Sequence, residues 1–466
     1  MNSLKYNIKF VLSLMEGFIV VDLVIKNCKI VYSSQIVEAG IAIENEKIVI
    51  IAKNPLLPKA DAVIDARGNY VFPGIIDAHA HIHDVKYLSH EDFKSGSIAA
   101  AAGGITCFIE ITLETPIVTP EQLKNKIKIG EKESIVDFSL HAGNMKEEYI
   151  KYVSEDVKIG VKSFKAFLSP PYRINIMTLQ KMMTEIAKCK GIQFLHAEDG
   201  EIVEYLEKEI KRLGSKKPSD YLDSRPNVAE REAIARALRV VKTTNCHLHI
   251  AHVTTKEGVY LIEEAKKSRL PVTAETCPQY LLFTAKDLEK WGPYLKMFPV
   301  LKSEKDREIL WEALENGTID IVVTDHAPSP REEKEVGWEN IWEAWGGIPG
   351  VETLLPIMLS EGVNKGRISI SRLYEVLCEK PAKIYGLYPR KGVINVGSDA
   401  DLVIVDLKKE TTIKADMLHY KCGWTPYEGM KVKGWPKTTI IRGKIVASEG
   451  EIFEKPGYGK FVPMQT

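Results

Sequence analysis

The chain has 466 residues, of which 45% are hydrophobic and 27% are charged. This composition indicates a folded globular protein and excludes a disordered or collagen-like chain. The 63 basic side chains balance 63 acidic ones, so the overall charge gives no reason to expect a nucleic-acid or membrane partner. At this length we expect one large domain and a smaller one.

The N-terminal segment resembles a secretory signal only loosely. Two lysines precede an apolar stretch over residues 10–21, but Glu16 interrupts it and no small-residue cleavage site follows. The stretch is also too short to span a bilayer. Met15 is an alternative start residue to Met1, and residues 1–14 would then be an upstream extension. The seven cysteines show no paired spacing, which favours reduced thiols and a cytoplasmic location.

Short alternating strands are predicted at both ends of the chain. Residues 18–63 alternate apolar and polar side chains between turn residues, without helical periodicity. The same pattern returns at residues 392–407 and 438–450. We therefore expect a small β-sandwich domain formed by both terminal segments, residues 1–70 and 389–466.

Between these ends, apolar strands alternate with amphipathic segments, which is typical of a parallel sheet in an α/β fold. Eight strands are expected, at residues 71–81, 105–111, 136–142, 161–168, 192–198, 246–253, 271–278 and 320–328. Helices are expected at residues 177–189, 229–242, 256–267 and 304–316. Eight strands in this alternation favour a closed (β/α)8 TIM-type barrel over residues 71–388.

Polar residues end five of the expected strands, where a barrel places its active site. They are His79, His81, Lys165, His196, His252 and Asp325. His79 and His81 are two residues apart, so strand alternation puts both imidazoles on one face. Imidazoles and a carboxylate suit Zn²⁺ or a similar divalent ion. Because four histidines and one aspartate exceed one tetrahedral site, two metal ions are expected.

Lys165 does not fit a simple metal site, because an ammonium group cannot bind a cation and is costly to bury. If the amine reacted with carbon dioxide, the resulting carbamate would be an anionic group able to bridge two cations. An ion-paired lysine, without modification, is the alternative that the spacing leaves open.

Several motifs together resemble the cyclic amidohydrolases, the group of dihydroorotases, allantoinases and hydantoinases. They include FPGIIDAHAH (72–81), GVKSFKAF (160–167), FLHAED (194–199), HIAHVTT (249–255) and IDIVVTDHAP (319–328). The resemblance covers nearly the whole chain. It implies a barrel enzyme with a β-sandwich, two metal ions and hydrolysis of the C–N bond of a small cyclic amide. It also suggests a homotetramer or homodimer.

The resemblance assigns a role to each polar strand residue. It implies that His79 and His81 bind the more buried metal and that His196 and His252 bind the second one. Lys165 matches a carboxylated lysine that bridges the metals, and Asp325 matches an aspartate that is both ligand and proton shuttle. The metal would be Zn²⁺ first, with manganese, cobalt and iron left open.

The substrate is harder to assign. Dihydroorotases carry an arginine two residues after the His-x-His pair, where this chain has His83. Hydantoinases carry a tyrosine at the position of Pro170, which nearby Tyr172 could replace. Segments 341–352, which includes Gly346, and 421–430 resemble allantoinases. An allantoinase-like activity is therefore expected first, then a hydantoinase or dihydropyrimidinase, then a dihydroorotase. A scaffold without catalysis is expected least. His83, Tyr172 and Gly346 are the candidate substrate contacts.

Two further groups of histidines are expected outside the metal site. His247 and His249 have the opposite strand parity to His252, so they should face the helices or solvent. His326 follows Asp325 and is expected to fix the end of its strand rather than to orient a substrate.

Overall fold

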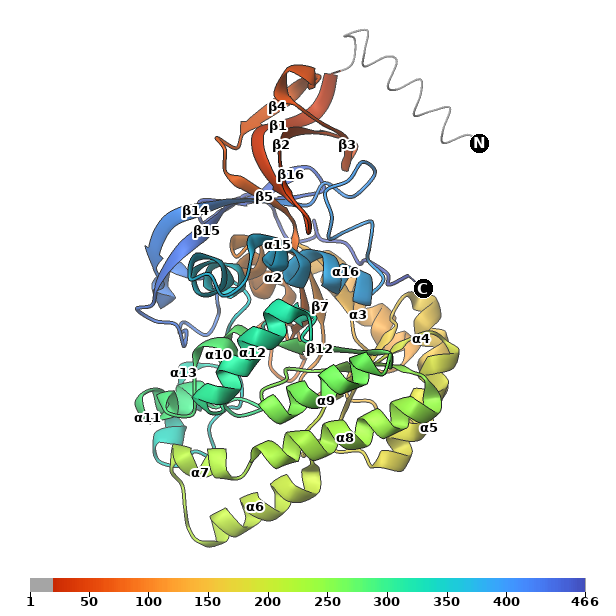
Figure 1. The fold of residues 1–466 in the computed structure, drawn as a ribbon, viewed down its shortest axis with the longest axis vertical. Coiled ribbons are helices and arrows are strands. Elements are labelled where there is room, and N and C mark those ends of the chain that lie inside the picture. Colours follow the sequence, from red (N-terminus) through yellow and green to blue (C-terminus); the bar gives the residue numbers. More distant parts are fainter. Residues whose placement is uncertain (1–19, 466) are drawn as a thin grey trace.

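One sheet combines strands from both ends of the chain in the computed structural model, which describes residues 20–465. Its order is β17-β16-β15-β14-β5-β1-β2-β3, and β4 pairs with β1. The strands are β1 (Val20–Val31), β2 (Ile36–Glu44), β3 (Lys47–Ala52), β4 (Lys59–Asp65), β5 (Tyr70–Pro73), β14 (Leu402–Thr412), β15 (Lys431–Ile441), β16 (Lys444–Ser448) and β17 (Glu451–Ile452). Figure 1 shows these red and blue strands together at one end of the molecule. This is the expected β-sandwich domain built from both termini.

A (β/α)8 barrel forms the rest of the fold, as expected. Its strands are β6 (Ile75–Ala80), β7 (Ile105–Glu110), β8 (Asp137–Leu140), β9 (Ser163–Phe167), β10 (Ile192–His196), β11 (His247–Ile250), β12 (Val272–Thr276) and β13 (Ile321–Val322). Neighbouring strands pair in parallel and in chain order, from β6 through β7 to β8 in one set and from β9 through to β13 in the other. Parallel bridges Ala142–Phe164 and Ala80–His326 join the two sets and close the barrel.

Gly74 separates the two domains within what the sequence predicted as one strand. β5 before it pairs with β14 in the terminal sheet, and β6 after it belongs to the barrel. A Cβ atom at Gly74 would lie 1.9 Å from Thr106 Oγ1. Only glycine therefore allows this close approach of the chain to the neighbouring strand. We propose that the domain boundaries lie within a few residues of those predicted.

The four predicted helices are confirmed as α5 (Ile176–Lys188), α8 (Asn227–Thr244), α9 (Lys256–Lys267) and α12 (Glu304–Asn316). The other α-helices are α2 (Phe93–Ala102), α3 (Pro120–Glu133), α4 (Val153–Ile159), α6 (Gly200–Arg212), α7 (Pro218–Asp223), α10 (Pro278–Leu282), α11 (Asp287–Trp291), α13 (Arg331–Glu335), α14 (Leu354–Ile357), α15 (Ile370–Tyr374) and α16 (Lys380–Ile384). α6 and α7 lie at the end of the molecule farthest from the terminal sheet (Figure 1).

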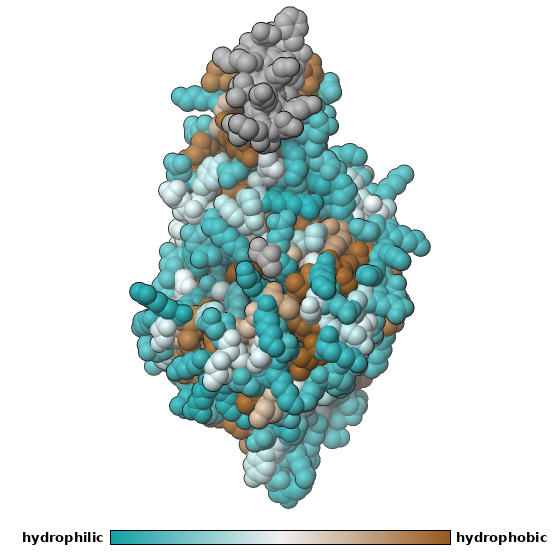
Figure 2. Space-filling view, turned by 90° about the vertical axis from the view of Figure 1, so that its right-hand side faces the viewer, coloured by the Kyte–Doolittle hydropathy of each residue, from teal (hydrophilic) through white to brown (hydrophobic). Residues whose placement is uncertain are grey.

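The surface is mainly hydrophilic on the face that Figure 2 shows, with apolar groups scattered between polar ones. Within residues 20–465, no helix is both long and apolar enough to cross a membrane. The predictions about residues 1–14 and Met15 lie outside the described residues.

Candidate metal centre and cavity

Three of the predicted ligands meet at the mouth of the barrel. His79 is the last residue but one of β6, His81 follows that strand, and Asp325 follows β13. Asp325 Oδ1 lies 3.2 Å from His79 Nε2 and 3.2 Å from His81 Nε2. One nitrogen of each ring and one carboxylate oxygen therefore converge on a single point, as a divalent ion requires.

The other ring nitrogens of this cluster are held by the protein. His79 Nδ1 donates to Glu275 Oε1 of β12 at 2.6 Å, and His81 Nδ1 donates to the carbonyl oxygen of Ile111 at 2.9 Å. These bonds leave both Nε2 atoms with free lone pairs that face the cluster. Such an outer partner is typical of histidines that bind metals, because it fixes the tautomer and the ring orientation.

His196 and His252 form a second pair beside the first cluster. His196 Nδ1 and His252 Nε2 lie 3.0 Å apart, so these two nitrogens also face a common point. His196 Nε2 donates to Glu198 Oε2 at 2.8 Å. The rings of His79 and His252 stack with their centroids 5.6 Å apart, which makes the two groups of ligands neighbours.

Lys165 lies between the two groups. Its Nζ atom is 3.5 Å from His79 Nε2 and 3.7 Å from the centroid of the Phe194 ring. Within residues 20–465 no carboxylate lies within ion-pair distance of this amine, although the side chain is only 1% exposed. The structure therefore does not show the ion-paired lysine that the sequence left open.

Burial controls the charge state of these groups. It lowers the pKa of His79 and of His252 well below the usual value of an imidazole, and Lys165 lowers both further. It also lowers the pKa of Lys165 to about 8. The rings are therefore neutral at pH 7, which is the form that binds metal, and about a tenth of the amine is in its neutral, nucleophilic form at this pH. This donor set fits divalent ions.

His252 and Asp325 adopt backbone conformations that are rare for residues with side chains. Their φ angles are 30° and 52°, in the left-handed region. Asp325 N donates to the carbonyl oxygen of His79 at 2.9 Å, which ties this strained turn to β6. Strain of this kind is common at functional sites, where the surrounding structure imposes it.

The strained turn at His252 explains one wrong prediction. His249 is fully buried inside the barrel, where its Nε2 donates to Glu275 Oε2 at 3.1 Å. In register it pairs with Phe194, which pairs with Lys165, so all three side chains face the same way. Because the chain leaves the strand after Ile250, parity counted back from His252 gives the wrong face for His249.

A cavity of about 740 Å³ opens over these residues. All six predicted strand-end residues line it, and so do two of the three candidate substrate contacts, Tyr172 and Gly346. The prediction for His83 is wrong, because this residue does not line the cavity. Its ring is 7% exposed and stacks on Phe93 of α2 with centroids 5.1 Å apart. Burial lowers its pKa to about 4, so it carries no charge for an anionic substrate.

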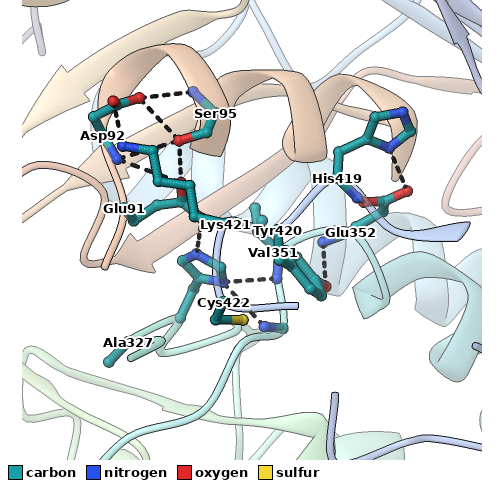
Figure 3. A network of polar contacts seen from close by, with 12 residues as sticks. Glu91, Asp92, Ser95, Ala327, Val351, Glu352, His419, Tyr420, Lys421 and Cys422 are labelled. Atoms are coloured by element: carbon teal, nitrogen blue, oxygen red, sulfur yellow. Dashed lines mark hydrogen bonds and ion pairs between the residues drawn. The ribbon is translucent and has the colours of Figure 1, made fainter. Parts of the chain in front are cut away.

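His326 fixes the segment after β13, a strand that ends at Val322, rather than the strand end that the sequence predicted. Gly350 N and Val351 N donate to its Nδ1 at 3.0 and 3.3 Å, and its Nε2 donates to Glu91 at 3.3 Å. Figure 3 shows the surrounding network, in which the segment that carries Tyr420 and Lys421 reaches the start of α2. The neighbour of Asp325 thus fixes backbone rather than substrate.

Sequence reasoning missed three charged residues of the site. Glu275 lies in β12, Glu198 follows β10, and Arg225 precedes α8. Each is at most 3% exposed. Two features of the sequence pointed to these residues. Glu275 is a carboxylate inside a predicted apolar strand, and Glu198 lies two residues after the candidate ligand His196.

Comparison with known proteins shows to which family the chain belongs. An amidohydrolase family model matches residues 70–446. The chain belongs to the amidohydrolase family. It is 40% identical to an L-hydantoinase of Paenarthrobacter aurescens over 95% of this chain and 98% of that one. An allantoinase of Rubrobacter xylanophilus is 35% identical over 95% and 98%. A solved L-hydantoinase structure from Arthrobacter aurescens matches with a TM-score of 0.92 and 39% identity, over 95% of this chain and 100% of that one.

Within the family the chain is a cyclic amidohydrolase of the group that also includes dihydroorotases. The similarities support the second expected activity, hydantoinase, better than the allantoinase expected first. Family and cluster together indicate a metal site at His79, His81 and Asp325.

Proposed function

We propose that this protein is a metal-dependent hydantoinase, which hydrolyses the cyclic amide C–N bond of a hydantoin-type ring. The observation that carries the proposal is the likeness to an L-hydantoinase in sequence and in structure, over almost the full length of both chains. The absence of His83 from the cavity argues against a dihydroorotate substrate, since it leaves no basic group at the position where dihydroorotases carry arginine.

Two divalent ions, Zn²⁺ in the first place, would be held by the six residues. His79 and His81 would bind one ion, His196 and His252 the other, and Asp325 the first. Lys165, as a carbamate, would bridge them. Bound there, such ions would lower the pKa of water and polarise the amide carbonyl.

Asp325 is the group that moves the proton. It is the one carboxylate that lines the cavity within 3.2 Å of both His79 and His81 among residues 20–465. In the proposed reaction it accepts a proton from the attacking water. It then gives this proton to the ring nitrogen as the C–N bond breaks. The products are a ureido NH₂ group and a carboxylic acid, which releases the second proton of the water to solvent.

Aromatic residues give the cavity an apolar wall suited to a ring substituent. Tyr172, Phe298, Trp342 and Trp345 line it together with Ile348. A Cβ atom at Gly346 would lie 2.0 Å from Phe298 Cε2, so this glycine lets the Phe298 ring pack against the loop. We propose that this wall receives an apolar group on the hydantoin carbon.

A ring-opening assay tests the proposal. The metal-loaded protein is given hydantoin, a benzyl-substituted hydantoin, dihydrouracil, allantoin and dihydroorotate in parallel. Hydantoins should be opened fastest, and dihydroorotate should not be opened. Asp325→Asn should lower turnover by at least about 100-fold, since it removes the proton acceptor but keeps the size of the side chain. Faster opening of allantoin would overturn the hydantoinase assignment and leave the metal site intact.

Two further predictions concern the protein as a whole: that it forms a homotetramer or homodimer, and that it is cytoplasmic. The alternative, a scaffold without catalysis, would instead contain far less than one equivalent of divalent ion after purification.

A further inference from the structure

The second pair of candidate ligands, His196 and His252, is supported by a buried ion pair that the first cluster lacks. Glu198 Oε2 accepts from His196 Nε2 at 2.8 Å and from Arg225 Nη1 at 2.6 Å. Glu198 is 1% exposed and Arg225 is 3% exposed. The three side chains thus form a continuous buried chain from guanidinium to carboxylate to imidazole.

This chain determines which nitrogen of His196 is free. Because His196 Nε2–H donates to the Glu198 carboxylate, the lone pair of His196 is on Nδ1, and that atom faces His252 Nε2 at 3.0 Å. Without the carboxylate, the hydrogen could sit on Nδ1 and point into the proposed metal position. Glu198 therefore selects the tautomer that can bind an ion.

Arg225 is itself held from several sides. Its guanidinium lies over the Phe298 ring at 4.4 Å, and its carbonyl oxygen accepts from Lys302 Nζ at 2.6 Å. Its position just before Pro226 and α8 places it at the start of a long helix. A buried carboxylate is costly unless a charge compensates it, and Arg225 supplies that charge to Glu198.

The first cluster is built differently. Glu275 accepts from His79 and from His249, but within the described residues no arginine or lysine lies within ion-pair distance of it. Arg225 also lines the cavity, which Glu275 does not. Glu275 also accepts from the backbone N of His252 at 3.3 Å and so touches both positions. Among the predicted ligands within residues 20–465, Glu198 is hydrogen-bonded only to His196, and Arg225 reaches that ligand through Glu198.

We infer that Glu198 and Arg225 are positioning residues for the second metal position, and that they act through His196 without contacting the ion. This inference rests on the proposed metal-dependent function. It predicts that loss of Glu198 or Arg225 weakens the second position selectively, because their hydrogen bonds reach the proposed ligands through His196. It also links the second position to the apolar wall, since Arg225 touches Phe298.

The test is a titration of the metal-free full chain with Co²⁺, followed by visible absorption and by competition with a chelator. The wild type should bind two equivalents. Glu198→Gln and Arg225→Met should lower the affinity for one equivalent by about 10- to 100-fold and leave the other unchanged. Anomalous scattering from Zn²⁺-loaded crystals should show the loss at His196 and His252. Arg225→Lys keeps the charge and should recover part of the affinity.

Arg372→Met is the matched control, because Arg372 is also buried and paired, with Glu375 at 2.6 Å, but lies outside the cavity. It should bind both equivalents normally. Thermal unfolding of each metal-free variant separates a folding defect from a metal defect. Unchanged affinity in Glu198→Gln and Arg225→Met, or equal loss of both equivalents, would overturn the inference. Failure of the wild type to open hydantoins would instead contradict the proposed hydantoinase function and leave this inference about the second metal position intact.

Discussion

Glu275 is a buried side chain that fixes the ring of His79, a candidate metal ligand. Its Oε1 accepts from His79 Nδ1 at 2.6 Å and from His252 N at 3.3 Å, and its Oε2 accepts from His249 Nε2 at 3.1 Å. Burial raises its pKa well above the usual value. By fixing the His79 ring it prepares a ligand atom for the first metal position, while His249 completes its own hydrogen bonds and contacts no ligand position directly.

Glu275→Gln should therefore weaken the first metal position. The amide offers one acceptor oxygen in place of two, so one of the two imidazole N–H groups would meet an NH₂ group. We expect a fall of about 10- to 100-fold in affinity for one equivalent of metal, measured by chelator competition. Glu361→Gln, a buried carboxylate paired with Lys365 far from the cavity lining, is the control. Unaltered affinity in Glu275→Gln would contradict the role given to this residue.

The amine of Lys165 gives the site a pH dependence. Only a neutral amine reacts with carbon dioxide, and burial places the pKa of Lys165 at about 8. The neutral fraction is small below this value and rises through it, so it should be about tenfold larger at pH 9 than at pH 7. With the concentration of dissolved ¹³CO₂ held equal at both pH values, the carbamate signal should form correspondingly faster in metal-free protein at the higher pH. A rate that falls as pH rises would contradict the carbamate proposal.

The loop after β13 is held by a buried lysine that donates to backbone carbonyl oxygens rather than to a carboxylate. Lys334 Nζ donates to the carbonyl oxygens of Lys296 and Trp345 at 2.9 and 2.8 Å. Lys334 is fully buried, and burial lowers its pKa well below the usual value of an amine. The loop that supplies Trp345 and Gly346 to the cavity is thereby fixed at its base.

Lys334→Met should loosen this loop. The substitution keeps the length and apolar stem but leaves two buried carbonyl oxygens unpaired, at about 1–3 kcal/mol each. We expect KM for a substituted hydantoin to rise several-fold while metal content stays normal, as measured by steady-state kinetics and elemental analysis. Lys365→Met, at an exposed lysine, should change neither. Metal loss in Lys334→Met with unchanged KM would show that the loop serves the metal centre instead.

The sequence predicted best those elements whose signal is local. The alternation of His79 and His81 placed both rings on one face, although the register of β6 against β7 shifts between Asp77 and Ala80. Parity failed for His249, because the turn at His252 with φ of 30° is not visible in a periodic pattern. Glu198 and Arg225 are 27 residues apart, and only the packing of α8 against the barrel brings them together.

His83 shows the complementary limit. Its place two residues after the ligand pair suggested a substrate contact, but the chain turns after β6 and buries the ring against Phe93. The motif therefore identified the family and six residues that line the cavity, whereas the choice of ring substrate depends on side chains whose positions the motif does not fix.

At the scale of the molecule, one buried ion network joins the barrel to the terminal sheet. Lys391 Nζ lies 2.7 Å from Asp137 Oδ2 at the start of β8, and it also pairs with Asp401, just before β14. Arg442, after β15, pairs with the same Asp137. Burial alone would raise the pKa of Asp137, but Lys391 and Arg442 hold it below the usual value.

Lys391→Met should destabilise the whole protein by about 3–5 kcal/mol, because it leaves buried carboxylates without their cation. Thermal or denaturant unfolding measures this loss. Lys47→Met, which removes a half-exposed partner of Asp399, should cost far less. The metal content of folded Lys391→Met should equal that of the wild type, since the network lies outside the cavity lining. A drop in metal content without a change in stability would contradict this division of roles.

The central claim is that six side chains from the ends of five strands hold two metal ions, and that one of the six, Lys165, bridges them as a carbamate. An anomalous-difference map from a crystal of the Zn²⁺-loaded protein tests it most directly. The account predicts two peaks, one beside His79 and His81 and one beside His196 and His252, at about 2.0–2.1 Å from their ring nitrogens, with carbamate density on Lys165. No peak at these nitrogens, with an unmodified Lys165 turned away from them, would contradict it.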